Sequence, residues 1–203
     1  MNEPLIHIVE DDAPLREALV RLFRSAALAS EAHSSVGDFL GRARPDRPGC
    51  LILDVRLPDM DGLELHGRLE ELGIVLPTIV ITGHGDIPMS VRAMKAGVVD
   101  FLVKPFRDQE MLDAVANALE RDQARRAAAS SSADLRARFE TLSVREREVM
   151  ALVTAGRMNK QAAWELGLSE ITVKIHRRAA MQKMGARSLA ELVRLAALLN
   201  APP

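Results

Sequence analysis

Four short apolar runs in the first half of the chain each end at a charged or hydroxyl side chain, and this pattern constrains the fold most. Such near-continuous runs are typical of parallel strands that helices cover on both faces. The runs are Ile6–Val9, Leu51–Leu53, Ile79–Ile81 and Phe101–Val103. They are followed by Glu10-Asp11-Asp12, Asp54, Thr82 and Lys104-Pro105. Because the carboxyl ends of parallel strands share one edge of a sheet, we expect these polar groups to meet there.

Strand and helix patterns alternate through residue 120. The predicted strands are Leu5–Val9, Leu28–Ala32, Cys50–Asp54, Thr78–Thr82 and Phe101–Val103. The predicted helices begin after Asp12, cover Val36–Gly41, run from Leu63 to Gly73, cover Ser90–Ala96 and begin near Asp108. Asp12 is the expected N-cap of the first helix, with Pro14 in its first turn. Five such units in about 120 residues predict a small doubly wound α/β domain.

Charge divides the chain into two parts. Residues 1–120 carry 12 basic and 20 acidic side chains, a net charge of −8, whereas residues 139–203 carry 10 basic and 6 acidic ones, a net charge of +4. The segment 121–138 has almost no large apolar residue, and we interpret it as a partly helical linker that breaks at Ser130–Ser132. We therefore expect two modules, 1–120 and 139–203, with different partners.

The remaining composition favours a cytoplasmic protein. Cys50 is the only cysteine, and we expect a buried, reduced thiol because it opens an apolar run. The sequence has neither a secretory leader at its N-terminus nor an apolar stretch of 18 residues, so we expect no membrane span. His7 is interpreted as a structural residue, His66 and His84 as residues without a ligand role, and no cluster of cysteine and histidine argues for zinc.

The polar groups at the predicted edge suit the transfer of a phosphoryl group. Mg²⁺ prefers oxygen ligands and takes few carboxylates, so Asp11 and Asp54 form the natural pair, with Glu10 acting through water. Acids this close repel one another unless a cation neutralises them. Lys104 and the hydroxyl of Thr82 can bind the oxygens of a phosphoryl group on Asp54, because a carboxylate can serve as a covalent acceptor.

Four motifs resemble the receiver domain of bacterial two-component response regulators. They are Glu10-Asp11, Asp54–Gly62, Thr82-Gly83-His84 and Lys104-Pro105-Phe106. The resemblance implies a flavodoxin-like, five-stranded parallel sheet of order 2-1-3-4-5, with Asp54 as the phosphorylated residue. It also implies that Asp11, Asp54 and the backbone carbonyl of Arg56 bind Mg²⁺ or Mn²⁺, with Glu10 acting at longer range. Glu10 stands where the family more often has aspartate.

The same resemblance implies switch residues. Thr82 would move toward the phosphate, and the aromatic Phe101 would then turn inward. An alternative stays open, in which Phe101 is an ordinary aromatic residue of the core and not a switch. The bond between Lys104 and Pro105 is expected to be cis, which is uncommon for X–Pro bonds in general.

Residues 139–203 have the pattern of four helices. Ser143 and Glu146 have the spacing of a capping box. Asn159–Leu166 and Ser169–Met184 are joined by a short turn with Gly167, which is typical of a helix-turn-helix. The expected packing residues, not all of which can point inward, are Ala162, Ala163, Leu166, Ile171, Val173 and Ile175, and Trp164 is expected to pack on the first of these helices. Lys174, Arg177 and Arg178 lie on the outward face of the second helix, which suits the major groove of DNA.

Periodicity alone leaves a plain helical bundle with a solvated basic face as an alternative. However, Leu142–Val149, Asn159-Lys160 and Thr172–His176 resemble the LuxR-type four-helix DNA-binding domain. By this resemblance, the residues that face bases are Lys174, Ile175 and Arg178. The residues that hold phosphates are Asn159, Lys160, Thr172 and Arg177. Together the two resemblances cover nearly the whole chain and are most similar to the FixJ/StyR group.

These resemblances imply a transcription regulator, not an enzyme. A sensor histidine kinase would phosphorylate Asp54, and the face made by the fourth helix and fifth strand would form a homodimer or release the half that binds double-stranded DNA. An activator is expected, with RNA polymerase as a further candidate partner.

Two other functions are compatible with part of this pattern. A phosphatase or phosphotransferase resembling haloacid dehalogenases needs a second aspartate two residues after Asp54, where Arg56 stands. A phosphorylation-independent regulator would use the receiver only for dimerisation. The intact Asp11, Thr82 and Lys104 count against that interpretation without excluding it.

Overall fold

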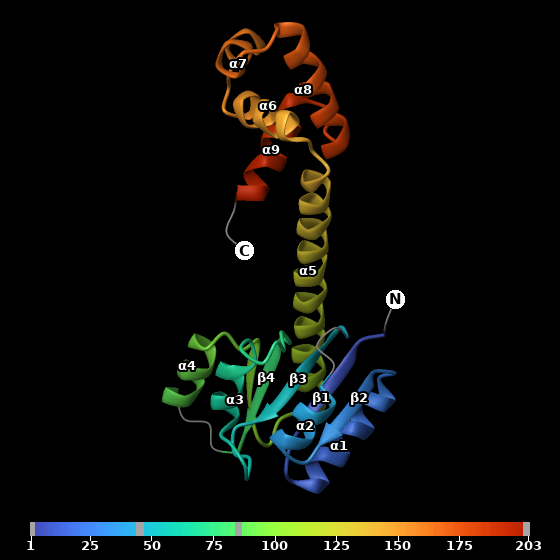
Figure 1. Cartoon of the computed structure of the whole chain (residues 1–203). Coiled ribbons are helices and arrows are strands. Elements are labelled where there is room, and N and C mark those ends of the chain that lie inside the picture. The colour runs from blue at the N-terminus through green and yellow to red at the C-terminus, as the bar shows by residue number, and fades with distance from the viewer. Residues whose placement is uncertain (1–2, 44–46, 84–86, 201–203) are drawn as a thin grey trace. The chain divides into compact units, whose positions relative to one another are not determined.

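The computed structural model describes residues 3–43, 47–83 and 87–200. The chain divides into two compact units, Met1–Arg125 and Arg126–Pro203 (Figure 1). Each unit has its own buried core.

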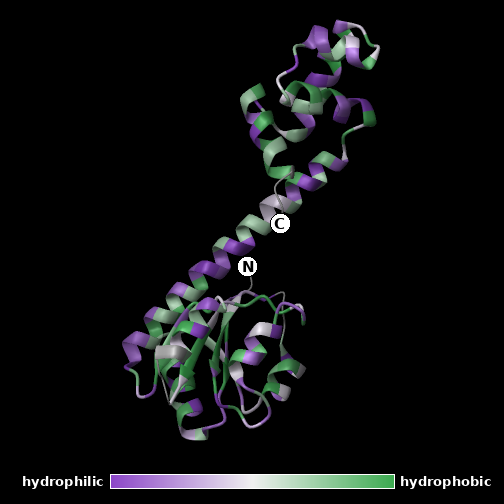
Figure 2. Ribbon diagram, turned by 90° about the vertical axis from the view of Figure 1, so that its left-hand side faces the viewer, coloured by the Kyte–Doolittle hydropathy of each residue, from purple (hydrophilic) through white to green (hydrophobic). Residues whose placement is uncertain are grey.

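The first unit is built on a five-stranded parallel sheet. Its strands are β1 (Leu5–Val9), β2 (Ala29–His33), β3 (Gly49–Asp54), β4 (Thr78–Thr82) and β5 (Asp100–Val103). Their order is β2-β1-β3-β4-β5, which confirms the predicted topology. Every residue of β1, β3 and β4 is buried, as expected for strands that are covered on both faces. Figure 2 shows these strands as a hydrophobic layer inside a more polar shell.

Helices cover both faces of this sheet. They are α1 (Ala13–Ser25), α2 (Val36–Arg42), α3 (Gly62–Arg68), α4 (Ile87–Lys95) and α5 (Asp108–Glu140). Phe23 of α1 and Met111 of α5 belong to one core cluster, whereas Phe39 of α2 and Leu65 of α3 belong to another. The doubly wound architecture is therefore the one that the sequence predicts.

Local sequence signals explain where the first helices begin. The Asp12 carboxylate accepts a hydrogen bond of 2.8 Å from the backbone N–H of Leu15, and Pro14 lies in the first turn of α1. Ser35 caps α2 in the same way. The differences from prediction are small: β2 lies one residue later, α4 begins at Ile87, and α3 ends before Gly73.

Helix α5 is continuous, so the predicted break at Ser130–Ser132 is wrong. Residues 121–138 contain neither glycine nor proline, and each serine costs a helix less than about 0.7 kcal/mol relative to alanine. Asp134 and Arg138 add an ion pair of 2.7 Å one turn apart. The polar composition of this segment therefore does not end the helix, and Leu135 within it is buried in the core of the second unit.

The second unit contains the C-terminal end of α5 and four further helices. These are α6 (Val144–Thr154), α7 (Asn159–Leu166), α8 (Glu170–Met184) and α9 (Leu189–Asn200). Val149, Val173 and Leu192 are fully buried in their shared core. Gly167, which ends α7, has a φ of 66°, in the left-handed region that favours glycine. Among the described residues, no helix is both long and apolar enough to cross a membrane.

The single cysteine lies within the first core. Cys50 is part of β3 and is fully buried with a free thiol, as predicted. Burial raises the pKa of this thiol to about 12. The thiol is therefore protonated at neutral pH and unreactive.

Candidate functional site

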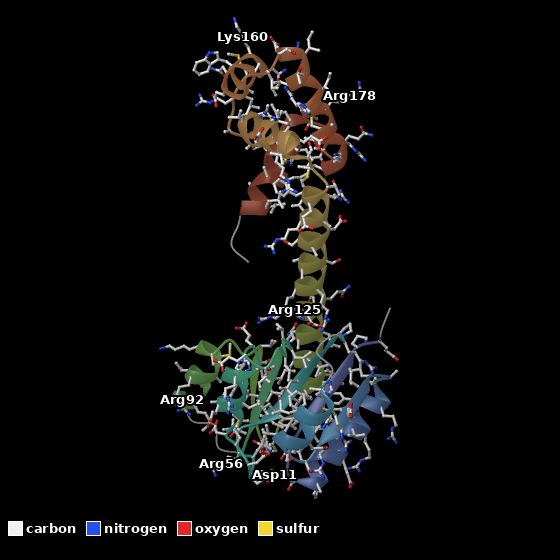
Figure 3. The ribbon with its side chains drawn as sticks, in the orientation of Figure 1. Asp11, Arg56, Arg92, Arg125, Lys160 and Arg178 are labelled. Carbon is white, nitrogen blue, oxygen red and sulfur yellow. The ribbon has the colours of Figure 1, made fainter. Side chains whose placement is uncertain are left out.

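The carboxyl edge of the sheet gathers the acidic side chains that the sequence singles out. Glu10 and Asp11 follow β1, and Asp54 is the last residue of β3. The carboxylate oxygens of these three residues lie within 4.8 Å of one another. Figure 3 shows Asp11 and Arg56 at the same end of the unit. We call Glu10, Asp11 and Asp54 the acidic cluster.

Lys104 joins two members of the acidic cluster. Its Nζ donates hydrogen bonds of 2.7 Å to Glu10 Oε2 and to Asp54 Oδ2. Lys104 follows β5, so this contact links strands that lie far apart in the sequence. Glu10 is fully buried and Asp54 nearly so. A single cation therefore compensates two carboxylates that are held away from water.

The pKa values in the cluster follow from this burial. Burial raises the pKa of Glu10 to about 7, although the hydrogen bond from Lys104 opposes the shift. Burial lowers the pKa of Lys104, but its hydrogen bonds to Asp54 and Glu10 outweigh that effect and raise the pKa overall. Lys104 thus remains charged, and the cluster holds more negative charge than one lysine neutralises.

The loop after β3 brings its backbone close to the cluster. The backbone N–H of Arg56 donates a hydrogen bond of 3.2 Å to Asp54 Oδ1. Gly62, at the start of α3, has no room for a side chain, because an added Cβ would lie 2.1 Å from the carbonyl oxygen of Asp54. Glycine at this position therefore lets the loop fold back against the end of β3.

Arg16 is a residue of this site that sequence reasoning missed. Its Nη1 donates hydrogen bonds of 2.8 Å to the carbonyl oxygen of Glu10 and 3.0 Å to that of Asp11. Arg16 lies one turn after the N-cap Asp12 on α1. This position, close to the end of β1, is the sequence signal that could have placed Arg16 near the acidic cluster. Its guanidinium group fixes the backbone that carries two of the acids.

The two predicted switch residues lie near the same edge. Thr82 is fully buried at the end of β4, where its carbonyl oxygen accepts a hydrogen bond of 2.8 Å from the backbone N–H of Lys104. The bond between Lys104 and Pro105 is cis, as predicted. Phe101 is half-buried and packs beside Val80. His84, which follows the Thr82 motif, lies outside the described residues.

The second unit carries the predicted helix-turn-helix. Helix α8 begins at the N-cap Ser169, whose hydroxyl accepts a hydrogen bond of 3.0 Å from the backbone N–H of Thr172. Val173 is fully buried, whereas Ile171 and Ile175 are 71% and 61% exposed. Of these three predicted packing residues, only Val173 packs, because Ile171 and Ile175 lie one turn apart on the opposite side of the helix.

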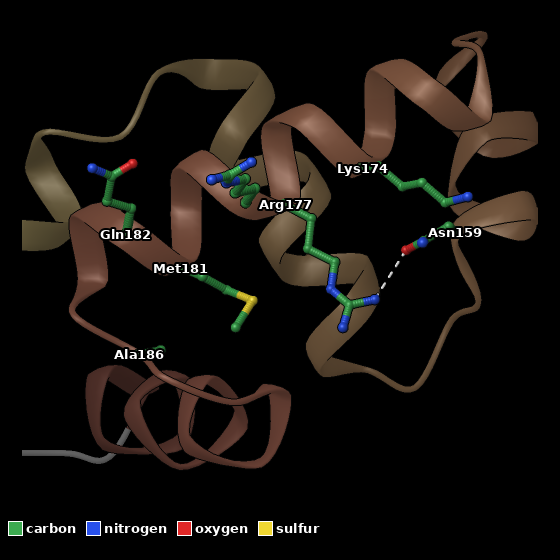
Figure 4. A pocket seen from close by; sticks show the side chains of 7 residues that line it. Asn159, Lys174, Arg177, Met181, Gln182 and Ala186 are labelled. Carbon is green, nitrogen blue, oxygen red and sulfur yellow. Dashed lines mark hydrogen bonds between the residues drawn. The ribbon is translucent and has the colours of Figure 1, made fainter.

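The outward surface of α8 is basic, as predicted. Lys174 and Arg178 are exposed, and Lys174 forms an ion pair of 3.2 Å with Glu170. Arg177 is half-buried, and its Nη1 donates a hydrogen bond of 3.2 Å to Asn159 Oδ1 at the start of α7 (Figure 4). An open hollow of about 560 Å³ is bordered by the side chains of Asn159, Lys174, Arg177 and Arg178. The hydroxyl of Thr172 lies 2.7 Å from that of Ser169.

Trp164 does not pack, so that prediction is wrong. The side chain is 85% exposed, because α7 buries Ala162 and Ala163 on its other side. Lys160 lies one turn earlier on the same helix and is also exposed (Figure 3). The indole and this ammonium group therefore share one exposed face of α7.

Comparison with known proteins decides the family. Residues 6–116 match the family described as response regulator receiver domain, and residues 140–196 match the luxR family of bacterial regulatory proteins. The chain is a two-component response regulator. It combines a receiver domain with a LuxR-type DNA-binding domain and regulates transcription.

Full-length relatives support the same organisation for this response regulator. It is 56% identical to Nodulation protein W of Bradyrhizobium diazoefficiens over 98% of the chain and 88% of that protein. It is 46% identical to the transcriptional regulatory protein FixJ of Rhizobium meliloti over 97% of the chain and 96% of that protein. The solved structure of the response regulator StyR matches with a TM-score of 0.86 and 46% identity, covering 96% of this chain and 98% of that one.

Proposed function

We propose that Asp54 accepts a phosphoryl group from a partner sensor histidine kinase and that this modification controls DNA binding. One observation carries the proposal: Asp54 lies 2.7 Å from the ammonium group of Lys104 and within 4.8 Å of two further acids at the carboxyl edge of the sheet. An Asp54 oxygen attacks the phosphorus of the donor phosphohistidine. The N–P bond breaks, and the imidazole keeps the electron pair and takes up a proton from solvent.

The donor set fits a hard divalent cation. Glu10, Asp11 and Asp54 offer only oxygen atoms, which is the ligand chemistry that Mg²⁺ and Mn²⁺ prefer. We expect the backbone carbonyl of Arg56 to supply a further oxygen ligand. Bound Mg²⁺ supplies positive charge that offsets both the acids and the incoming phosphoryl group. Arg16 holds the backbone of Glu10 and Asp11 in place for this role.

After transfer, Lys104 and Thr82 bind the new phosphate oxygens. Thr82 ends β4, which lies next to β3, and Lys104 follows β5, which lies next to β4, so a small shift of either residue moves the edge formed by β4 and β5. Phe101 turns inward as Thr82 moves. A change of population from 1:99 to 99:1 requires about 5.5 kcal/mol of differential stabilisation, which a doubly charged phosphate beside a lysine is suited to provide.

The surface of α4 and β5 is the proposed dimer interface. Val91 and Met94 of α4 and Val103 of β5 are roughly half exposed, which is unusual for apolar residues gathered on adjacent elements. On phosphorylation, two chains form a homodimer through this surface, or the DNA-binding domain is released.

For the domain limits we keep 1–120 for the receiver domain and 139–203 for the DNA-binding domain, with 121–138 as the helical linker.

The basic surface of α8 enters the major groove of double-stranded DNA. Lys174, Ile175 and Arg178 contact base edges. The phosphate contacts come from Asn159, Lys160, Thr172 and Arg177. A dimer then reads two half-sites about one helical turn of DNA apart. Lys174→Ala and Arg178→Ala each weaken specific binding by about 1–3 kcal/mol, whereas Lys160→Ala weakens binding to all sequences alike.

The experiment that tests this function follows a small phosphodonor and DNA affinity together. The wild-type chain is expected to become labelled and to bind operator DNA more tightly, and Asp54→Asn is expected to lose both effects. Asp113→Asn, an exposed acid on α5, is the matched control. Labelling that persists in Asp54→Asn would overturn the acceptor. If the DNA affinity is the same with and without the phosphodonor, and the same in the wild type and in Asp54→Asn, the result would favour the phosphorylation-independent regulator.

A further inference from the structure

A second group of potential metal ligands lies between the first two strands. His7 of β1 is paired with Glu31 of β2, and His33 lies two residues further along β2, so the three side chains share one face of the sheet. One ligand atom from each lies within 4.8 Å of the other two. No sequence pattern indicates this group, because the register between β1 and β2 brings residues 7 and 33 together.

The two imidazoles have the separation that a metal ion requires. His7 Nδ1 lies 3.2 Å from His33 Nε2. Two nitrogen ligands of a tetrahedral zinc ion, each at 2.0–2.1 Å, lie about 3.3 Å apart. The two nitrogen atoms now share one proton in a hydrogen bond, and a metal ion replaces that proton without a large movement of either ring.

The surroundings of His33 resemble the outer shell of a metal site. Its other ring nitrogen, Nδ1, lies 3.5 Å from Asp38 Oδ2 and makes no hydrogen bond with the described residues, although it is fully buried. A carboxylate behind a histidine orients the ring and makes it a better ligand. The ring of Phe39 packs edge-on against both imidazoles, at 5.4 and 5.5 Å between centroids.

We propose that His7, Glu31 and His33 bind one divalent transition metal ion of the zinc type. His7 Nδ1, His33 Nε2 and a Glu31 oxygen are the three protein ligands, and water takes the fourth position. Glu31 is half-buried, so it gives the ion a path from solvent. Imidazole ligands select zinc and its neighbours, whereas the oxygen-only acidic cluster favours magnesium, so the two sites differ in the metal that they take.

Spectroscopy with Co²⁺ tests the proposal on the full chain. The background variant is Asp54→Asn, and excess Mg²⁺ competes for any remaining affinity at the acidic cluster. One Co²⁺ per chain is expected to bind, with the strong visible absorption of tetrahedral coordination, and Zn²⁺ is expected to displace it. Glu31→Gln is expected to weaken the affinity by at least about tenfold, and Asp38→Asn by about 10- to 100-fold.

His66→Gln, which removes an imidazole outside the group, is the matched control and is expected to leave binding unchanged. Because Glu31 is partly exposed, its substitution tests the site even where His33→Gln fails to fold. Absence of stoichiometric Co²⁺ binding would overturn the proposal. Binding that survives both Glu31→Gln and His7→Gln would overturn it as well.

Discussion

Lys104 makes the acidic cluster compatible with burial. Its ammonium group contacts Glu10 and Asp54 at 2.7 Å, and the side chain is 20% exposed. The two carboxylates have almost no contact with water. A buried charge that loses its partner destabilises a protein more than the intact pair stabilises it. The consequence of removing this one cation is therefore predictable.

The variant Lys104→Met is expected to lower the free energy of unfolding by about 1–3 kcal/mol in the absence of Mg²⁺. This is less than the full cost of breaking a buried pair, because the lysine is partly exposed. Urea unfolding measures the change. Lys95→Met, an exposed lysine on α4, is the control. A midpoint equal to that of the wild type would contradict the expected role of Lys104.

Trp164 offers a direct measurement at the DNA-binding surface. It is the only tryptophan of the chain, and it shares the exposed face of α7 with Lys160, a proposed phosphate contact. Operator DNA is expected to quench its fluorescence and to protect it from iodide, because the indole lies beside the proposed DNA backbone contact. Emission that stays constant at saturating DNA would place this face of α7 outside the interface.

At the scale of elements, the start of α6 is held by a charged capping box. Glu146 Oε2 accepts hydrogen bonds of 2.7 Å from the Ser143 backbone and from Lys183 Nζ of α8. The hydrogen bond from Lys183, and then that from Ser143, lowers the pKa of Glu146 below its usual 4.5. Since the folded state favours the carboxylate, its stabilising contribution is fully present above pH 4.5 and is lost as the pH falls through the folded pKa.

Glu146→Gln is expected to destabilise the second unit by about 1 kcal/mol at neutral pH, a typical value for a lost cap. The difference between variant and wild type should shrink below pH 4.5, because the wild-type carboxyl group becomes protonated there. Urea unfolding as a function of pH measures both effects. Glu148→Gln alters a half-exposed acid of the same helix, which forms an ion pair of 2.8 Å with Arg145, and provides the control. A difference that stays constant into the acid range would contradict the assignment.

Elements with strong local signals were predictable from sequence. The bounds of β1, β4 and α7 agree with the structure, because apolar runs and helix caps mark them. The acidic cluster was predictable as well, because its residues follow β1 or end β3. Arg16 was missed because it acts on backbone oxygens, and its position one turn after the N-cap Asp12 was its only mark in the sequence.

Other features depended on contacts that sequence does not encode locally. The His7–His33 contact depends on the register of β2, and its predicted bounds were one residue early. The exposure of Trp164 depends on which side of α7 meets the bundle, and the two small residues Ala162 and Ala163 decide that. A polar composition at Ser130–Ser132 indicated a break, although helix propensity favoured continuity.

At the scale of the whole molecule, the two units differ in charge and in partner. The acidic half carries the acidic cluster, and the basic half carries the surface of α8. Phosphorylation of the wild-type chain is expected to raise the dimer fraction in sedimentation velocity, while Asp54→Asn stays monomeric. Met94→Glu should reduce the dimer, because it places a charge in the proposed apolar interface. No shift on phosphorylation would argue for release of the DNA-binding domain instead.

The buried thiol of Cys50 has a practical consequence for following that change. Because thiolates, and not protonated thiols, react with maleimide and spin-label reagents, the native chain should stay unmodified under mild labelling conditions. One cysteine introduced on the surface of each unit would then carry the only two dyes. Energy transfer between them would report how the distance between the units responds to the phosphodonor, with no need to replace a core residue first.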